Sequence, residues 1–213
     1  MKGIVVVGAG GHAKVVIETL RAMGRPVAWC IAPGGGECLG VPILAGDDHL
    51  EKLREDGHTE AVIAIGSNAL RARLAEKVAG AGYELVTAVH PQAVVSPSAK
   101  IGKGVAILPG AIINADAVIE DLAIINSGAV VEHDSRVGYG AHLGPLCGIA
   151  GQVTLGRMAF LGLGAKVIPG ITIGANTTVG AGAVVISDLP ADVVAVGVPA
   201  RIAKSARPDA SGA

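Results

Sequence analysis

The sequence predicts a small α/β domain with a Rossmann-like parallel sheet, followed by a parallel β-helix built from six-residue repeats. From Val95 onward an aliphatic residue recurs at every sixth position, whereas residues 1 to about 88 alternate short apolar runs with helical patterns. Hydrophobic residues make up 51% of the chain but aromatic residues only 2%. The core must therefore be assembled from small aliphatic side chains, which suits a regular stack of short units.

The repeat extends over sixteen successive hexads. They open with Val95, Ile101, Ile107, Ile113, Ile119, Ile125, Val131, Val137, Leu143, Ile149, Leu155, Leu161, Val167, Ile173, Val179 and Val185. The fifth place is usually small, and glycine is common at the second and fourth places. Three hexads complete a triangular coil of about 18 residues, and successive coils stack about 4.7–4.9 Å apart through parallel strands. About five coils fit between Val95 and Val185, with the aliphatic residues inside.

The first part of the chain follows a βα pattern. Strands are predicted at 4–7, 27–31, 61–65 and 85–89, and helices at 12–23, 48–55 and 68–81. This order is typical of a parallel sheet covered by helices. The predicted organisation is an α/β domain over 1–88, a β-helix over 89–204 and a disordered tail over 205–213.

Composition excludes several classes of function. Seventeen basic residues against eighteen acidic ones leave no charge excess to hold a nucleic acid or an anionic membrane. No apolar run reaches the length of a membrane span, and the N-terminus is predicted to be a strand rather than a signal peptide. The three cysteines have no metal-ligand spacing, which favours a cytoplasmic protein without a metal.

A glycine-rich turn follows the first predicted strand. The segment Gly8-Ala9-Gly10-Gly11-His12-Ala13 matches G-x-G-x-x-G/A, where backbone N–H groups at a helix start hold a phosphate. The candidate binding residues are Gly10, Gly11, His12 and Ala13. A dinucleotide site also requires an acid after the second strand, but Ile31-Ala32-Pro33 stands there. Three interpretations remain open at this point: another nucleotide diphosphate, a plain packing turn, or NAD.

A second loop is expected at the same edge of the sheet. Ser67 and Asn68 lie where the strand predicted at 61–65 leads into its helix. Because the carboxyl ends of parallel strands meet at one edge, this loop and the glycine-rich turn are expected to line one crevice.

Two histidines stand nine residues apart in the repeat, within VEHDSRVGYGAH. Val131 and Ser135 take inward positions, so His133 and His142 fall at the third and sixth places of their hexads, outside the core. Asp134 beside His133 is placed to fix its tautomer and raise its basicity, as a general base requires. Nine residues are half a coil, so the two imidazoles lie on different sides of one prism. They cooperate only if another subunit brings them together, and a three-fold assembly suits flat prism faces.

The chain resembles the left-handed β-helix acyltransferases, and within them the bacterial nucleotide-sugar N-acetyltransferases. Segments with this resemblance occur throughout the chain: VVVGAGGHAKVVIETL at its start, AIGSNALR, HPQAVVSPSAKIG, INSGAVVEHDSRVG and VGVPARI near its end. The left hand of the helix comes from this resemblance, since the six-residue period alone does not determine it.

The resemblance implies a homotrimer that transfers acetyl from acetyl-CoA to the C4 amine of a nucleotide-linked dideoxy amino sugar, UDP- or GDP-linked. It places the catalytic base on His133, with Asp134 tuning its basicity, and an acetyl-CoA contact on His142. The residues implied to line the cofactor groove are Gly151, Leu163 and Ala181, and those matching the nucleotide-sugar loop are Gly11, His12 and Ala13.

Other classes of protein stay open at the level of sequence. An O-acetyltransferase acting on a sugar or on sialic acid uses the same histidine and differs in its acceptor pocket. A zinc-dependent β-helix hydratase uses interface histidines as metal ligands, but it does not require the α/β domain. A sugar-nucleotide-binding scaffold without catalysis is a further alternative.

Overall fold

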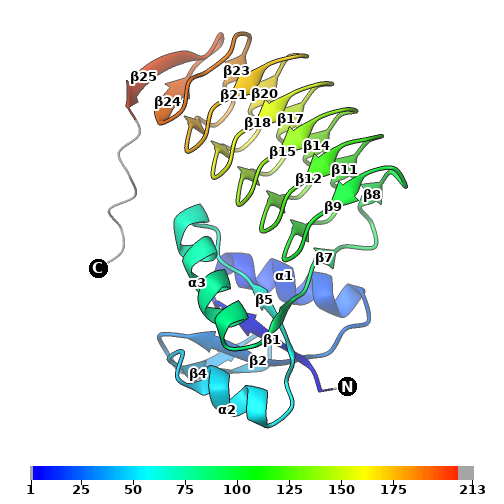
Figure 1. Ribbon diagram of the computed structural model, residues 1–213, viewed down its shortest axis with the longest axis vertical. Coiled ribbons are helices and arrows are strands. Elements are labelled where there is room, and N and C mark those ends of the chain that lie inside the picture. Colours follow the sequence, from blue (N-terminus) through cyan, green and yellow to red (C-terminus); the bar gives the residue numbers. More distant parts are fainter. Residues whose placement is uncertain (1, 206–213) are drawn as a thin grey trace.

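The computed structural model describes residues 2–205. It contains an α/β domain followed by a β-helix of about six turns (Figure 1). The α/β domain lies against the first coils, and its last helix runs beside the β-helix. No helix among the described residues is long and apolar enough to span a bilayer.

The α/β domain has one six-stranded sheet of order β3-β4-β2-β1-β5-β6. Its strands are β1 (Ile4–Val7), β2 (Val27–Ala32), β3 (Gly36–Cys38), β4 (Val41–Ala45), β5 (Glu60–Ile63) and β6 (Glu84–Leu85). Its helices are α1 (Gly11–Ala22), α2 (His49–Glu55) and α3 (Asn68–Gly80).

The two faces of this sheet follow from the alternation along β1. Ile4 and Val6 pack with α1, whereas Val5 and Val7 pack with residues of α2 and α3. All four β1 side chains are buried, as expected for a central parallel strand covered by helices on both faces. The result is a three-layer domain whose strand ends carry the two predicted loops.

The sheet is mixed, which corrects the predicted parallel sheet. β3 and β4 were not predicted; β4 pairs in parallel with β2, and β3 pairs antiparallel with β4. Leu39 and Gly40 form the turn between them with φ values of 51° and 74°. Positive φ at both positions is the requirement of a type I′ hairpin turn, and a leucine at the first of them gives no turn signal in the sequence.

The β-helix has three flat faces. The first face is β25-β24-β22-β19-β16-β13-β10-β7, the second is β23-β20-β17-β14-β11-β8 and the third is β21-β18-β15-β12-β9.

The strands of these faces are short, and most contain two residues. Those of the first face are β7 (Ala88–Val89), β10 (Ala106–Ile107), β13 (Ile124–Ile125), β16 (His142–Leu143), β19 (Phe160–Leu161), β22 (Thr178–Val179), β24 (Val193–Val196) and β25 (Arg201–Ser205). Those of the second face are β8 (Val94–Val95), β11 (Ile112–Ile113), β14 (Val130–Val131), β17 (Gly148–Ile149), β20 (Lys166–Val167) and β23 (Val184–Val185). Those of the third face are β9 (Lys100–Ile101), β12 (Val118–Ile119), β15 (Arg136–Val137), β18 (Thr154–Leu155) and β21 (Thr172–Ile173).

Stacking at intervals of eighteen residues confirms the predicted coil. Val131 pairs with Ile113 on one side and Ile149 on the other, and the other aliphatic openers pair in the same way. These openers form one continuous buried core with the small residues of the fifth places. Burial of each Val, Ile or Leu contributes roughly 1.5–3 kcal/mol, so the repeat itself supplies most of the stability of this part.

The corners of the prism account for the glycine, Asp and Asn residues at the fourth place of many hexads, whereas Leu122, Leu146, Gln152 and Met158 take the same place without such a preference. From Gly104 to Gly182 the fourth residue of every hexad has a positive φ. Glycine adopts this left-handed conformation without strain, and Asp or Asn tolerates it better than most residues. Asp134, with φ 57°, is one of these corner residues, so the coil fixes the backbone of the aspartate that pairs with His133.

The junction and the C-terminal end differ from prediction. The strand predicted at 85–89 is divided between β6, which ends the α/β sheet, and β7, which begins the β-helix. The C-terminal end is closed by β24 and β25, an antiparallel pair that the six-residue pattern did not predict. Ser205 is the last residue of β25, and the rest of the predicted tail lies outside the described residues.

Candidate active site

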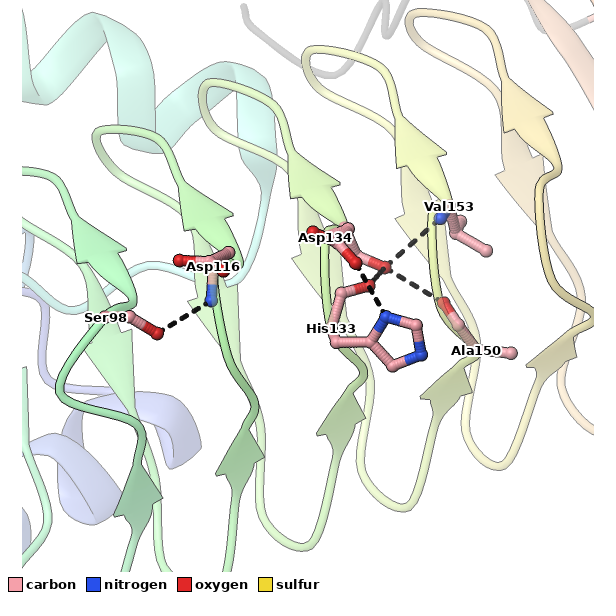
Figure 2. Close-up of polar contacts among 7 residues, drawn as sticks. Ser98, Asp116, His133, Asp134, Ala150 and Val153 are labelled. Atoms are coloured by element: carbon pink, nitrogen blue, oxygen red, sulfur yellow. Dashed lines mark hydrogen bonds and ion pairs between the residues drawn. The ribbon is translucent and has the colours of Figure 1, made fainter.

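His133 and Asp134 form a pair at the corner between the second and third faces, after β14 (Figure 2). Nδ1 of the imidazole lies 2.8 Å from a carboxylate oxygen of Asp134. The side chains are 58% and 52% exposed. Because Nδ1 donates its proton to the carboxylate, Nε2 keeps its lone pair and is free to accept a proton. The hydrogen bond from Asp134 raises the pKa of His133 above its ordinary value, opposed by some loss of hydration and assisted by the charges of Asp134 and Glu132.

Ser135 holds this corner in place. Its hydroxyl donates to the carbonyl of Ala150 at 2.9 Å and accepts from the backbone N–H of Val153 at 3.1 Å (Figure 2). The side chain is 1% exposed. The sequence indicated only a small inward residue here, but the hydroxyl ties the His133 corner to the same corner of the next coil.

Gly151 lies beneath the imidazole, one coil further along the same corner. A Cβ added at Gly151 would come within 2.6 Å of both Cε1 and Nε2 of His133. The ring can lie this close to the backbone of the coil edge only because residue 151 has no side chain.

Replacement of Gly151 by alanine is expected to push the His133 ring off this edge. The clash is with the end of an exposed side chain, so we expect the melting temperature to change by no more than a few degrees. Turnover is expected to fall by about tenfold or more, because a displacement of about 1 Å is costly for a proton acceptor. Gly80→Ala, at the exposed end of α3, is the matched control, because an added Cβ there meets no atom within 4 Å and the backbone φ is not positive. The control should keep wild-type turnover, and unchanged turnover in Gly151→Ala would contradict the role given to residue 151.

His142 lies on the first face, in β16, and confirms that the two imidazoles occupy different sides of one prism. Its ring is outside the prism core, as predicted, but it is only 8% exposed, because His12 and Val15 of α1 pack over this part of the first face. The six-residue pattern gave no indication of this burial. The amide nitrogen of Asn126 donates to Nε2 at 3.1 Å, and the ring packs edge-on against Phe160 with centroids 5.1 Å apart.

His12 reaches the same place from the start of α1. Its ring centroid is 6.3 Å from that of His142. Burial, with the nearby charge of Arg71, lowers the pKa of His12 to about 4 and that of His142 to about 3. Nε2 of His12 and Nδ1 of His142 are buried without a hydrogen-bond partner among the described residues. Both imidazoles are therefore neutral at physiological pH.

Acidification is expected to destabilise the fold through this histidine pair. The unfolded chain binds a proton to each histidine near pH 6.5, whereas the folded protein stays neutral until about pH 4 at His12 and pH 3 at His142. The contribution of these two histidines to the free energy of unfolding should thus have its full value above pH 6.5 and should fall as the pH decreases below 6.5. Urea unfolding at pH 7.0, 6.0 and 5.0 measures this slope. His142→Asn should flatten it, and an unchanged slope in that variant would contradict the assignment.

The glycine-rich turn leads into α1 as predicted. Gly10 precedes the helix with no side-chain cap, and no acidic residue occupies the first turn. Gly10 and Gly11 are exposed, and a Cβ at either position would meet nothing within 4 Å. The unpaired N–H groups of a helix start therefore face open space, which suits a phosphate. Ala13, in contrast, is fully buried in the domain core, so only its backbone is available to a ligand.

The second loop is used differently from the prediction. Ser67 caps α3 by accepting from the backbone N–H of Leu70 at 3.4 Å. The side chain of Asn68 turns toward the β-helix, where its amide donates to the carbonyls of Met158 and Ala159 at 2.9 and 3.3 Å. The loop thus makes contacts within the molecule that the sequence did not reveal.

The three predicted groove residues lie at two different corners. Gly151 belongs to the corner between the second and third faces, whereas Leu163 and Ala181 belong to the corner between the first and second faces. Leu163 is 54% exposed, and Leu146 at the same corner is 59% exposed. Within one chain the whole width of the second face separates Gly151 from the other two. These residues, like the two histidines, approach one another only if different chains contribute them.

The second face is the most apolar of the uncovered faces. Its outward column is Val94, Ile112, Val130, Gly148, Lys166 and Val184. The equivalent column of the third face is Lys100, Val118, Arg136, Thr154 and Thr172. Exposed Ile168 and Ile186 extend the apolar area to the edge of the second face. No group of three or more His, Cys, Asp or Glu residues within residues 2–205 is arranged to hold a metal ion.

Two family models match the chain. Residues 3–78 match the PglD N-terminal domain, and residues 98–133 match the bacterial transferase hexapeptide of six repeats.

Solved structures match nearly the whole length. Perosamine N-acetyltransferase from Caulobacter crescentus, in complex with CoA and GDP-perosamine, is 55% identical with a TM-score of 0.93, over 95% of this chain and 97% of that one. Two further structures of this relative carry a substituted histidine. The acetyltransferase domain of PglB from Neisseria gonorrhoeae, in complex with acetyl coenzyme A, is 33% identical with a TM-score of 0.90, over 94% of this chain and 98% of that one.

A curated relative matches a shorter region. UDP-N-acetylbacillosamine N-acetyltransferase of Bacillus subtilis is 40% identical over 115 residues, which are 51% of this chain and 52% of the relative. The match thus spans about half the length of that protein.

Proposed function

Because the chain belongs to the nucleotide-sugar N-acetyltransferases of the left-handed β-helix family, we propose that it acetylates the C4 amine of a nucleotide-linked dideoxy amino sugar from acetyl-CoA. GDP-perosamine or a UDP-linked 4-amino sugar is the proposed acceptor. The observation that carries the proposal is the exposed His133–Asp134 pair, whose Nε2 is free to take a proton. The Caulobacter crescentus relative, whose structure holds CoA and GDP-perosamine, supports the choice of substrates.

The active enzyme is proposed to be a homotrimer that packs through the second face. This face is flat and apolar, and its two edges carry the two separated halves of the site. His133 and Gly151 lie on one edge, and Leu163 and Ala181 lie on the other. In a closed three-fold ring one edge of each subunit meets the opposite edge of its neighbour. This arrangement completes three equivalent sites, each shared by two chains.

The first step is binding of the sugar nucleotide that carries the acceptor amine. The open start of α1, with Gly10 and Gly11, receives the diphosphate, and His12 lies beside it. Neutral His12 and His142 each have an unpaired buried nitrogen at this place. We assign them to hydrogen bonds with the sugar nucleotide and the thioester arm, because neither imidazole has the basicity needed for proton transfer.

His133 then acts as the general base. Its Nε2 takes a proton from the amine as nitrogen adds to the acetyl carbonyl, and Asp134 stabilises the imidazolium that forms. Backbone N–H groups near Gly151 are proposed to stabilise the charge that develops on the carbonyl oxygen. The C–S bond breaks as the carbonyl forms again, and the imidazolium returns its proton to the departing thiolate of CoA. The proton taken from the amine thus leaves on the thiol of CoA, and His133 returns to its neutral form.

No acyl-enzyme is part of this proposal. Cys147 is fully buried, and its thiol is directed at the carbonyls of Leu161 and Gly162. Burial raises the pKa of this thiol above its ordinary value. A protonated, enclosed thiol is a poor nucleophile, which favours direct transfer from acetyl-CoA to the amine.

A thiol-release assay tests the proposed function. The purified protein is incubated with acetyl-CoA and a panel of GDP- and UDP-linked 4-amino sugars, each paired with its 4-hydroxy counterpart. We expect CoA release with at least one amino sugar and a product mass increased by one acetyl group. Turnover of only the hydroxy sugars would establish an O-acetyltransferase instead. No turnover of any of them would refute the proposal.

A further inference from the structure

A buried arginine joins the two domains. Arg71, in the first turn of α3, is 1% exposed and uses all five of its N–H groups. Nε donates to the carbonyl of Leu122 at 2.8 Å, and Nη2 donates to the carbonyl of Gly140 at 2.6 Å and to Oδ1 of Asn68 at 2.8 Å. Nη1 donates to the carbonyls of Ile65 and Gly66 at 3.0 and 3.2 Å.

Every partner of this guanidinium is neutral. No carboxylate within residues 2–205 forms an ion pair with it. Burial lowers the pKa of Arg71 to about 10, so it remains charged at neutral pH. An apolar residue holds two packed surfaces together at less desolvation cost than a buried charge. The planar guanidinium has a partner for each of its N–H groups, and it therefore fixes the direction of each of these hydrogen bonds.

Together Arg71 and Asn68 contact three successive coils. Leu122, Gly140 and Met158 occupy the same corner, between the third and first faces, at intervals of eighteen residues. Arg71 binds the carbonyls of the first two, and Asn68 binds that of the third. Because these hydrogen bonds follow one corner of the β-helix over three coils, they resist both sliding and rotation of the α/β domain relative to it.

The other side of the arginine reaches the proposed nucleotide loop. Ile65 and Gly66 follow β5, whose neighbour β1 leads into the glycine-rich turn. The backbone N–H of Ala64 donates to the carbonyl of Val7 at 2.8 Å, and a Cβ on Gly8 would come within 2.7 Å of the carbonyl oxygen of Ala64. The two loops therefore have little freedom to move relative to each other, and a shift at Arg71 is transmitted to His12.

We propose that Arg71 is a positioning residue that, with Asn68, sets where the nucleotide-binding loop stands relative to the β-helix, and so where the acceptor amine arrives. The inference rests on the proposed function, because it takes that loop as the holder of the sugar nucleotide. Arg71 does not contact the reacting atoms. It acts through the nucleotide-binding loop, by keeping the position and orientation of the acceptor amine within the narrow range that attack on the thioester requires.

Arg71→Lys is the test, because lysine keeps the charge and much of the length but lacks the planar fork. We expect the circular dichroism spectrum and the oligomeric state to be unchanged. The Kd for GDP or UDP, measured by calorimetry, should stay within about threefold, since the loop itself is intact. The kcat/KM for acetyl transfer should fall by about 10–100-fold. Arg73→Lys, at an exposed position on the same helix, is the matched control and should retain wild-type kinetics.

Hydrogen exchange gives a readout that does not depend on activity. Arg71→Lys should exchange faster than wild type in segments 120–122, 139–140 and 157–159, and Asn68→Ala should do so mainly in segment 157–159. A variant that melts at a lower temperature but keeps wild-type kcat/KM would show that Arg71 only stabilises the fold, and would overturn the inference. Unchanged exchange at all three segments would overturn it as well, even if the wild-type protein acetylates no sugar and the proposed function has failed.

Discussion

Replacing His133 with alanine is expected to lower kcat by about 10²–10⁴-fold, the usual contribution of a positioned general base. The side chain is more than half exposed and lies outside the prism core, so folding and assembly should be unaffected. Steady-state CoA release at saturating acetyl-CoA measures the loss, and unchanged light scattering confirms assembly. His49→Ala, at the half-buried first position of α2, is the histidine control and should keep wild-type turnover.

The pH profile separates a base from a residue that only contacts the substrate. Asp134 raises the pKa of His133, so Asp134→Asn should move the acidic limb of kcat/KM toward lower pH while reducing the plateau. The limb reports deprotonation of the free enzyme's base. If His133→Ala kept near-normal turnover, or if Asp134→Asn left the limb in place, the base would have to be sought elsewhere.

Replacing Ile112 with glutamate is expected to prevent assembly and abolish activity. Ile112 points outward from the second face, between Val94 and Val130 on the neighbouring strands. A carboxylate there is solvated in a monomer but is buried unpaired in the proposed trimer, which costs several kcal/mol per subunit. Sedimentation should show a monomer with the wild-type circular dichroism spectrum, and CoA release should fall below detection.

Val118→Glu is the matched control on the third face. Val118 pairs with Lys100 and Arg136 on the neighbouring strands, so a glutamate there gains two cationic neighbours. This variant should remain trimeric and active. A monomeric wild-type protein, or loss of assembly from Val118→Glu but not from Ile112→Glu, would place the subunit interface on another face or remove it.

The β-helix was predictable because the residue types at each place of a hexad indicate which side chains face inward and where the chain turns. The aliphatic opener fixes which residues face inward, and this assigned His133 and His142 to the outside of the prism correctly. The repeat also located the corners, where Asp134 has the left-handed backbone that brings its carboxylate to His133.

Contacts between distant parts were not predictable from local patterns. The sequence gives no sign that α1 packs over part of the first face, and so the burial of His142 was missed. Asn68 was predicted to bind substrate, yet its amide is directed at the β-helix. Arg71 lies in a helix among other charged residues, and only the packing of α3 against the β-helix distinguishes it from the exposed Arg73.

The β3–β4 hairpin was missed for a different reason. Its turn uses Leu39, a residue with no preference for positive φ. Tertiary pairing of β4 with β2 overrides the local propensity at this position. The strand predicted at 85–89 illustrates the same limit, because an aliphatic run does not indicate which of two sheets it joins.

Complementation between two inactive variants tests the shared site most directly. His133→Ala removes the base, and Gly11→Glu places a carboxylate where the diphosphate is proposed to bind, at a helix start that tolerates an acid. Each variant alone should be inactive. In co-expressed, randomly mixed trimers each site takes its base from one chain and its nucleotide loop from the next, so about a quarter of the sites should be intact. Recovery of roughly a quarter of wild-type CoA release is the expected result, and a mixture no more active than its two components would contradict the account.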